Sequence, residues 1–284
     1  MNGSVTAGSA RESWRTLEPV HAMVYFAPEA QQEYAAIGLD SSINRAIGYF
    51  PPRAAPMGAV AWPVVQATFF NFSGRAVQTG MAGCWDTVTP QQVLDARLRG
   101  VDRALTRLCG DLLADIGEAV ELARRACEGC TPYGRPLYAA HTGLAWPEPA
   151  HLQLWHAITL LREFRGDGHI AALVTEGLSG LQAAIMHVAQ ADLWSRKPLQ
   201  ASRAYTDQEW DGEVERMVAL GWLTPEETFT EEGRALRQRV EDLTDELALP
   251  SWEVIGEHGC ARLRELVAPL RAAVVGNGGY PLKR

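Results

Sequence analysis

The chain has 284 residues, of which 47% are hydrophobic and 21% charged, and its formal net charge is −8. This composition is typical of a folded globular protein and excludes a disordered chain. No apolar run reaches the about 18 residues of a transmembrane helix, so we expect no membrane span. A chain with this acidic balance binds nucleic acid only if its lysines and arginines gather on one face.

The N-terminal sequence and the cysteines bear on the cellular compartment in which the protein resides. Residues 1–14 lack the basic start and apolar block of a secretory signal, and we expect a short flexible lead-in there. The five cysteines are odd in number and irregularly spaced, which favours free thiols in a reducing cytoplasm. Cys127 and Cys130 form a CxxC motif, but the sequence shows neither a second zinc-ligand pair nor a thioredoxin-like βαβ pattern. We therefore predict a cytoplasmic protein in which this pair ends a helix and binds no metal.

Helical patterns dominate the first half of the chain. Residues 28–39 predict a helix that begins at a proline. Residues 48–58 are rich in proline and predict a non-helical, stiff loop. Residues 89–110 and 115–129 predict two further helices with apolar positions at helical spacing.

The middle of the chain combines an apolar helix with a dense group of charges. Residues 149–165 are apolar on nearly all sides, as in a buried helix. The stretch LREFRGDGHIAAL, residues 161–173, nevertheless places five charged or ionisable side chains within eight positions. Gly166 and Gly168 predict that one helix ends there, and residues 169–194 then continue as one kinked helix or two.

The last third predicts a helix, a short hairpin and a long helix. The first helix covers residues 205–223, and the hairpin follows it with the sequence TPEETFT. Thr230 is expected to cap the long helix, and Pro250 to stop it. A final helix covers residues 258–275. One apolar seam of the long helix is expected to serve as a homodimer contact; it consists of Leu236, Val240, Leu243 and Leu247.

This order of elements carries a resemblance to known proteins. Residues 205–250, and especially ALGWLTPEETFTEEGRALRQ, resemble the winged helix of MarR-type regulators. The stretches HAMVYFAPEA, RAAPMGAV, LWHAITLLREFRGDGHIAAL and TEEGRALRQRVEDLTDELALPSW are similar to an actinobacterial family described as helix-turn-helix, or SalK-like. The resemblance implies no particular reaction. The order of elements predicts a mainly α fold with a helical region over residues 15–200, in which the residues discussed below suggest a ligand pocket, and a winged-helix-like module over residues 201–284.

Two segments of the chain also resemble each other. TPQQVLDARLRGVDRALTRL and TDQEWDGEVERMVALGWL both begin with a capping box, formed by Thr89 with Gln92 and by Thr206 with Glu209. Each follows a tryptophan. An internal duplication of one helical unit is therefore an alternative description of the fold.

The charge of the winged-helix-like module argues against DNA binding. The helix before a wing needs Arg, Lys, Asn or Gln to reach phosphates and base edges. Here it carries Arg216 against five acids, Asp207, Glu209, Asp211, Glu213 and Glu215, and the TPEETFTEEG segment adds four glutamates. Affinity for nucleic acid comes mainly from cation–phosphate contacts. A small basic patch upstream, Arg196, Lys197 and Arg203, is too small to reverse this balance, so we expect that DNA binding has been lost.

Residues 161–173 provide the first group of candidate site residues. Asp167 is expected to be an N-cap that accepts from the amide of Ile170, which places His169 at a helix N-terminus and favours its neutral form. Arg162 and Arg165 lie one turn apart and could clamp a carboxylate or a phosphate.

Upstream on the same helix, His156 and Glu163 lie two turns apart, so Glu163 could orient the imidazole. A purely structural role for this whole cluster, with caps and ion pairs satisfied inside the core, accounts for the pattern equally well.

A second group of residues suggests an aromatic pocket. His21 and Tyr25 are four residues apart on one helical face, and Arg53 lies on the proline-rich loop. Aromatic side chains near these positions are sufficient to line a flat apolar ligand site, although each alone is equally consistent with core packing. Those selected for the site are Tyr25, Tyr49, Phe70 and Trp155.

Three functional hypotheses follow. The first is a small-molecule-binding protein, in one form an enzyme of bacterial specialised metabolism, with a ligand that is aromatic or anionic. The second is a MarR-like, ligand-responsive regulator with the same pocket, and the third is a non-catalytic helical interaction protein.

Under the first hypothesis the candidate residues divide by role. The ligand-binding residues are Arg53, Arg162, Arg165, Tyr25, Tyr49, Phe70 and Trp155. The acid, base or orienting residues are His21, His156, His169, Asp167 and Glu163. No cofactor is predicted, and haem or a metal bound through a histidine stays an open alternative.

Overall fold

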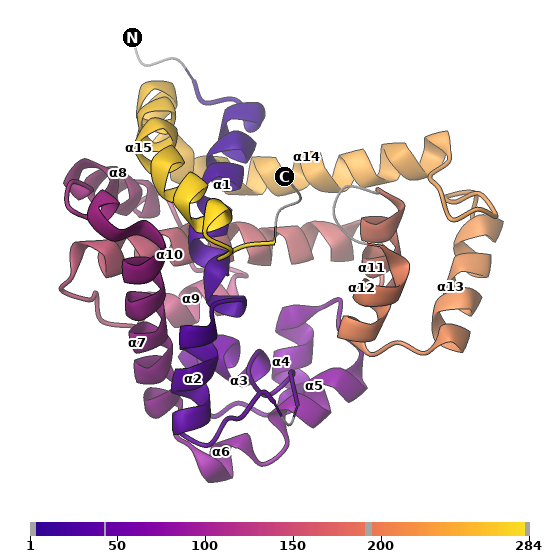
Figure 1. Ribbon diagram of the computed structural model, residues 1–284. Coiled ribbons are helices and arrows are strands. Elements are labelled where there is room, and N and C mark those ends of the chain that lie inside the picture. Colours follow the sequence, from indigo (N-terminus) through magenta and orange to yellow (C-terminus); the bar gives the residue numbers. More distant parts are fainter. Residues whose placement is uncertain (1–3, 43, 191–194, 282–284) are drawn as a thin grey trace.

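The structure, a computed structural model, describes residues 4–42, 44–190 and 195–281 (Figure 1). Within these ranges the regular secondary structure is helical, apart from one isolated β-bridge. The prediction of a mainly α fold is therefore confirmed.

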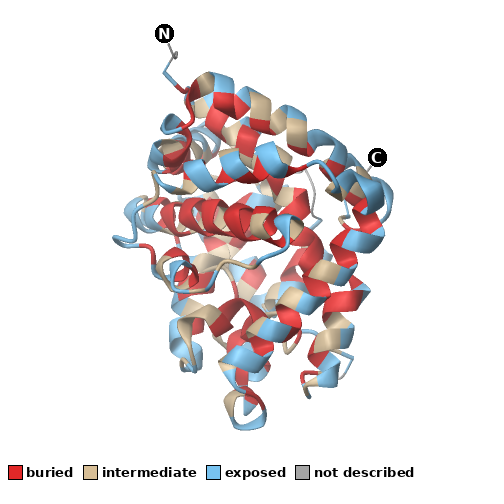
Figure 2. Ribbon diagram, turned by 90° about the vertical axis from the view of Figure 1, so that its left-hand side faces the viewer, coloured by how far each residue is buried: buried red, intermediate tan, exposed pale blue. Residues whose placement is uncertain are grey.

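Two long helices form the frame of the molecule. α10 (Ala150–Thr175) and α14 (Glu231–Glu253) pack side by side, and most side chains of α10 are buried (Figures 1 and 2). α1 (Ala7–Ala22) contacts both of them and packs along α15 (Gly256–Gly276). Because each long helix has buried positions along much of its length, the pair can serve two hydrophobic cores at once.

The first hydrophobic cluster combines residues 5–161 with residues 252–274. Besides the frame helices, it holds the helices that precede α10 in the chain. These are α2 (Pro28–Ala36), α3 (Phe50–Ala54), α4 (Trp62–Phe69), α5 (Gly74–Met81), α6 (Cys84–Thr87), α7 (Pro90–Cys109), α8 (Gly117–Cys127) and α9 (Pro136–Thr142). Short 3-10 turns at Met23–Tyr25, Ala55–Met57 and Gly110–Leu113 connect them.

The second hydrophobic cluster is smaller and draws on residues 172–240. It contains the end of α10, the start of α14, and α11 (Gly180–Ala189), α12 (Arg196–Arg203) and α13 (Asp207–Ala219). Trp210, on α13, is fully buried at its centre. The predicted domain boundary at residue 200 stays a prediction. α11, which precedes that residue, packs against α12 and α13, whereas α15, near the end of the chain, packs against α1.

Several predicted helix starts are confirmed by their caps. Thr89 and Thr206 form complete capping boxes with Gln92 and Glu209, and the Thr230 hydroxyl accepts from the amide of Gly233. These caps satisfy amide groups that have no partner inside the helix. The predicted short hairpin is also confirmed: in the described residues, an antiparallel bridge joins Leu223 to Phe229, and the Thr224 amide donates to the Thr228 carbonyl at 2.8 Å.

The largest correction concerns residues 161–173. α10 does not end near Gly166 but continues to Thr175, and Gly168 has another reason to be glycine. A Cβ atom there would lie 2.7 Å from Nη1 of Arg135 and 3.3 Å from Cβ of Leu247 on α14. The glycine permits close packing between the two long helices instead of ending one of them.

Three further expectations are corrected. α1 begins at Ala7, so residues 7–14 are helical and not a flexible lead-in. Pro51 and Pro52 lie in the first turn of α3, where the missing amide hydrogen costs nothing, so this part of the loop is a short helix. Pro250 lies within α14, whose last turn is held by the buried Trp252. Residues 191–194, the end of the helix predicted over 169–194, lie outside the described residues.

The expected dimer seam is largely used within the chain. Leu236 and Val240 are buried in the second cluster, Leu243 is half-buried against it, and Leu247 is exposed. The homodimer stays a prediction, and any such contact would have to use other residues as well.

We expect Gly180 to be required where α11 meets the segment after α4. A Cβ atom on Gly180 would lie 2.1 Å from the carbonyl oxygen of Phe70, so Gly180→Ala should lower the free energy of unfolding by about 1–3 kcal/mol. Gly212, inside α13, has open space around its Cβ position. Gly212→Ala should therefore raise stability by up to about 1 kcal/mol. Urea unfolding of both variants measures this, and equal effects would contradict the described contact.

Candidate functional site

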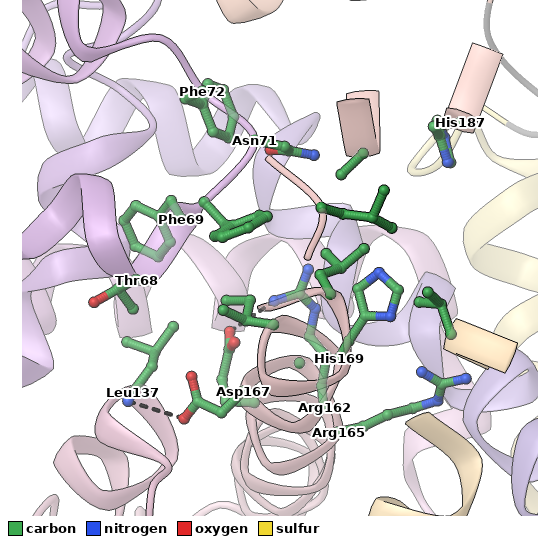
Figure 3. Close-up of a pocket in the computed structure, with 18 of the residues that line it drawn as sticks. Thr68, Phe69, Asn71, Phe72, Leu137, Arg162, Arg165, Asp167, His169 and His187 are labelled. Atoms are coloured by element: carbon green, nitrogen blue, oxygen red, sulfur yellow. Dashed lines mark hydrogen bonds and ion pairs between the residues drawn. The ribbon is translucent and has the colours of Figure 1, made fainter. Parts of the chain in front are cut away.

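A cavity of about 360 Å³ lies between the two hydrophobic clusters. Its walls come from α1, α3, the end of α4 with the segment after it, the start of α9, α10, α11, the end of α12, and α14. Figure 3 shows Phe69 and Phe72 on one side of the view and His169 and His187 on the other. Eight of the twelve predicted site residues line it; they are Tyr49, Arg53, Phe70, Arg162, Glu163, Arg165, Asp167 and His169.

Arg53 is held against the aromatic wall of the cavity. Its guanidinium lies 4.3 Å from the ring centre of Phe69, and Nη1 donates to the Tyr49 hydroxyl at 2.7 Å. Nη2 lies 3.3 Å from a carboxylate oxygen of Glu163, and Nε is buried without a partner. Arg53 therefore keeps unused hydrogen-bonding capacity beside aromatic rings.

Arg162 and Arg165 do not act as the joint clamp that was predicted. Arg162 lies between Glu18 of α1, at 3.3 Å, and Glu163, at 2.7 Å. Arg165 points toward α14 and pairs with Asp245 at 2.8 Å. Because carboxylates on the neighbouring helices neutralise both guanidinium groups, neither is left to bind an external anion by itself.

Arg203 is the cavity residue that sequence reasoning missed. It is the last residue of α12, and its guanidinium lies 4.1 Å from the ring centre of Phe72. Its Nε is buried without a partner, and Nη1 has only the Ser202 hydroxyl, at 3.0 Å. No carboxylate within the described residues pairs with it. Its position depends on a tertiary contact, the bond from the Ser73 amide to the Arg203 carbonyl, for which the sequence contains no local signal.

The arginines determine the ionisation of their neighbours. Burial alone would raise the pKa of Glu163, but Arg162 and Arg53 outweigh it and hold the pKa at about 2. Burial also opposes ionisation of Tyr49, yet Arg53, Arg203 and Arg162 together bring the pKa of the phenol below its ordinary value. The surroundings of Glu163 and Tyr49 therefore favour negative charge at this part of the cavity.

Asp167 and His169 have other roles than those expected. Asp167 does not cap its own helix; its carboxylate accepts from the amides of Leu137 and Tyr138, at 3.0 and 2.9 Å, and so caps α9. Burial raises its pKa to about 6. His169 is not at a helix N-terminus, since α10 is continuous there. Burial, and not a helix dipole, lowers its pKa to about 4 and keeps the imidazole neutral.

The other four predicted site residues are not part of the cavity wall. His21 hydrogen-bonds to Tyr25 at 3.0 Å, as its position one turn away suggested, and stacks on Trp155 with ring centres 5.5 Å apart. His156 packs edge-on against Trp146, and its Nε2 is buried without a partner. Glu163 is engaged by Arg53 and Arg162, so it does not orient His156 as expected.

Metal binding receives no support from the geometry. No group of three or more His, Cys, Asp or Glu in residues 4–42, 44–190 and 195–281 is arranged to hold a metal ion. Cys127 ends α8, and burial raises the pKa of its thiol well above the ordinary value and that of Cys130 to about 12. None of the described helices has the length and apolarity of a membrane span.

The acidic helix α13 pairs with the basic residues nearest to it. Lys197 lies 3.0 Å from Asp207, Arg75 lies 2.5 Å from Glu209, and Arg196 pairs with Asp211. Of the basic patch recognised in the sequence, Arg196 and Lys197 are thus neutralised by the chain itself, and Arg203 lines the cavity, so little of the patch is left to meet phosphates.

Comparison with known proteins identifies a family. A family model described as helix-turn-helix family matches residues 10–281, and the chain therefore belongs to this family. No curated protein and no solved structure matches the chain.

The buried histidines should make the protein sensitive to acid. Burial lowers the pKa of four of them: His21, His141, His156 and His169. In the unfolded chain they bind protons below pH about 6.5. The free energy of unfolding should therefore fall from pH 6.5 toward pH 4. The loss is roughly 1.4 kcal/mol per pH unit for each proton that the unfolded chain binds and the folded chain does not.

Two carboxyls with raised pKa, Glu18 and Asp167, oppose part of this loss. Urea unfolding between pH 7 and pH 4.5 measures the net slope. His156→Phe should reduce the pH slope of the free energy of unfolding by the contribution of one histidine. A free energy of unfolding that does not change with pH would contradict the assignment of neutral imidazoles.

Proposed function

We propose that this member of the helix-turn-helix family binds a small organic anion with an aromatic or apolar body in the cavity between its two hydrophobic clusters. The observation that supports it most is Arg203. A guanidinium without a carboxylate partner is costly to bury, and a bound carboxylate or phosphate would supply that partner through charged hydrogen bonds.

The aromatic wall supports the second half of the proposal. Phe72 lies against Arg203, and Phe69 and Tyr49 lie against Arg53. Flat apolar surface beside a small number of directed polar groups is the usual composition of a small-molecule site. A planar ligand could stack on these rings while its anionic group reaches Arg203 and the unused Nε of Arg53.

Two specific functions are compatible with such a binding site, an enzyme and a ligand-responsive regulator. An enzyme of specialised metabolism would use groups that reach the cavity, of which His169 and Tyr49 are the candidates for moving a proton. A ligand-responsive regulator would use the same cavity to control DNA binding. The ion pairs between α13 and its neighbouring basic residues favour the first form, because they oppose the approach of this helix to phosphates.

We expect Arg203→Met to weaken binding of naphthalene-2-carboxylate, a fluorescent planar anion, by about 10- to 100-fold. Methionine keeps contact with Phe72 but removes the charge. Arg216→Met, on the exposed surface of α13, is the matched control and should leave affinity unchanged. Equal affinity of the wild type and Arg203→Met would contradict the proposal, as would tighter binding of the neutral naphthalene-2-carboxamide.

The same substitution should not destabilise the ligand-free protein. Because Arg203 makes no ion pair with the described residues, Arg203→Met should leave the free energy of unfolding unchanged or raise it. Thermal unfolding without ligand measures this. A loss above about 1 kcal/mol would instead indicate that Arg203 has a structural role.

A further inference from the structure

His169 presents one ring nitrogen to the cavity in a fixed state. Its Nδ1 lies 2.9 Å from the hydroxyl oxygen of Thr244 on α14. That hydroxyl donates its hydrogen to the carbonyl of Val240 at 2.6 Å, so toward the imidazole it can only accept. Nδ1 must therefore carry the hydrogen, and Nε2 of the neutral ring is left with a lone pair.

The same arrangement occurs a second time in the molecule. His21 Nδ1 lies 3.0 Å from the Thr159 hydroxyl, which donates to the Trp155 carbonyl at 2.8 Å. There the lone pair on Nε2 is satisfied by the phenol of Tyr25, at 3.0 Å. The protein thus contains two histidines held by a threonine in the same tautomer, one of which already accepts a hydrogen bond from a phenol.

At His169 no described residue occupies the position that Tyr25 takes at His21. His169 instead lines the cavity, across the view in Figure 3 from Phe69 and Phe72. An imidazole nitrogen that receives no hydrogen bond from the protein needs a donor from the ligand, and a site built around such an acceptor discriminates strongly against ligands that lack one.

We infer that His169 Nε2 accepts a hydrogen bond from a hydroxyl group of the bound anion, so that the ligand is a phenolic acid with its hydroxyl remote from its acidic group. This inference rests on the proposed function, because it assigns one end of the same ligand. Arg203 and Arg53 bind the acidic group, and His169 binds the hydroxyl. Thr244 is a positioning residue that sets the tautomer.

The test compares two probes that differ in one hydrogen-bond donor, 6-hydroxy-2-naphthoate and 6-methoxy-2-naphthoate. The wild type should bind the hydroxy probe at least about 10-fold more tightly. His169→Phe should remove this preference while both probes keep their dependence on Arg203. His258→Phe, at an exposed position on α15, is the matched control and should retain the preference.

The outcomes separate the two proposals. If both naphthoates bind through Arg203 but the wild type shows no preference, or the preference survives in His169→Phe, the inference is wrong and the proposed function stands. If neither probe binds the wild type, both are overturned.

Nitrogen-15 NMR of the ligand-free wild type provides a readout that needs no variant to fold. The ring of His169 should carry its hydrogen on Nδ1, and Thr244→Val should shift this population toward Nε2. A wild-type ring protonated on Nε2 would overturn the inference directly.

Discussion

The contact between α10 and α14 is the constraint on which the rest of the structure depends. Gly168 permits the two helices to approach closely, and the Arg165–Asp245 ion pair and the His169–Thr244 hydrogen bond join them. Each helix also contributes to both hydrophobic clusters. The charges of residues 161–173 are therefore not an interruption of a core helix. They are the polar side of a helix that faces α1, α14 and the cavity between the clusters.

Much of the fold could be predicted from the sequence where the signal is local. Capping boxes at Thr89 and Thr206 mark helix starts because both partners lie within four residues. The errors arise where a distant contact decides. Gly168 looks like a helix end until Leu247 is placed against it, and Pro250 looks like a stop until the burial of Trp252 is known.

The candidate site divides in the same way. Residue type and spacing were sufficient to select Arg53, Tyr49 and His169, which do meet at one cavity. They could not show that Arg162 and Arg165 are neutralised by acids on α1 and α14. Nor could they find Arg203, whose place beside Phe72 depends on how α12 returns to the segment after α4. Pairing between distant charges decides which arginine is available, and periodicity contains no information about it.

The distribution of charge around α13 and the cavity bears on what this family member binds. The acidic residues of α13 pair with nearby basic side chains. Arg203, which has no carboxylate partner among the described residues, lies at the cavity and not on the outer face of α13. Under the proposed function, the cavity and not α13 offers positive charge to an anion. This distribution favours the binding of a small molecule over the reading of DNA.

A crystal structure of the protein soaked with naphthalene-2-carboxylate tests this central claim most directly. We expect the carboxylate within hydrogen-bond distance of the Arg203 guanidinium, with the rings against Phe69 and Phe72. A ligand bound elsewhere, or a cavity that remains free of it at saturating concentration, would contradict the account.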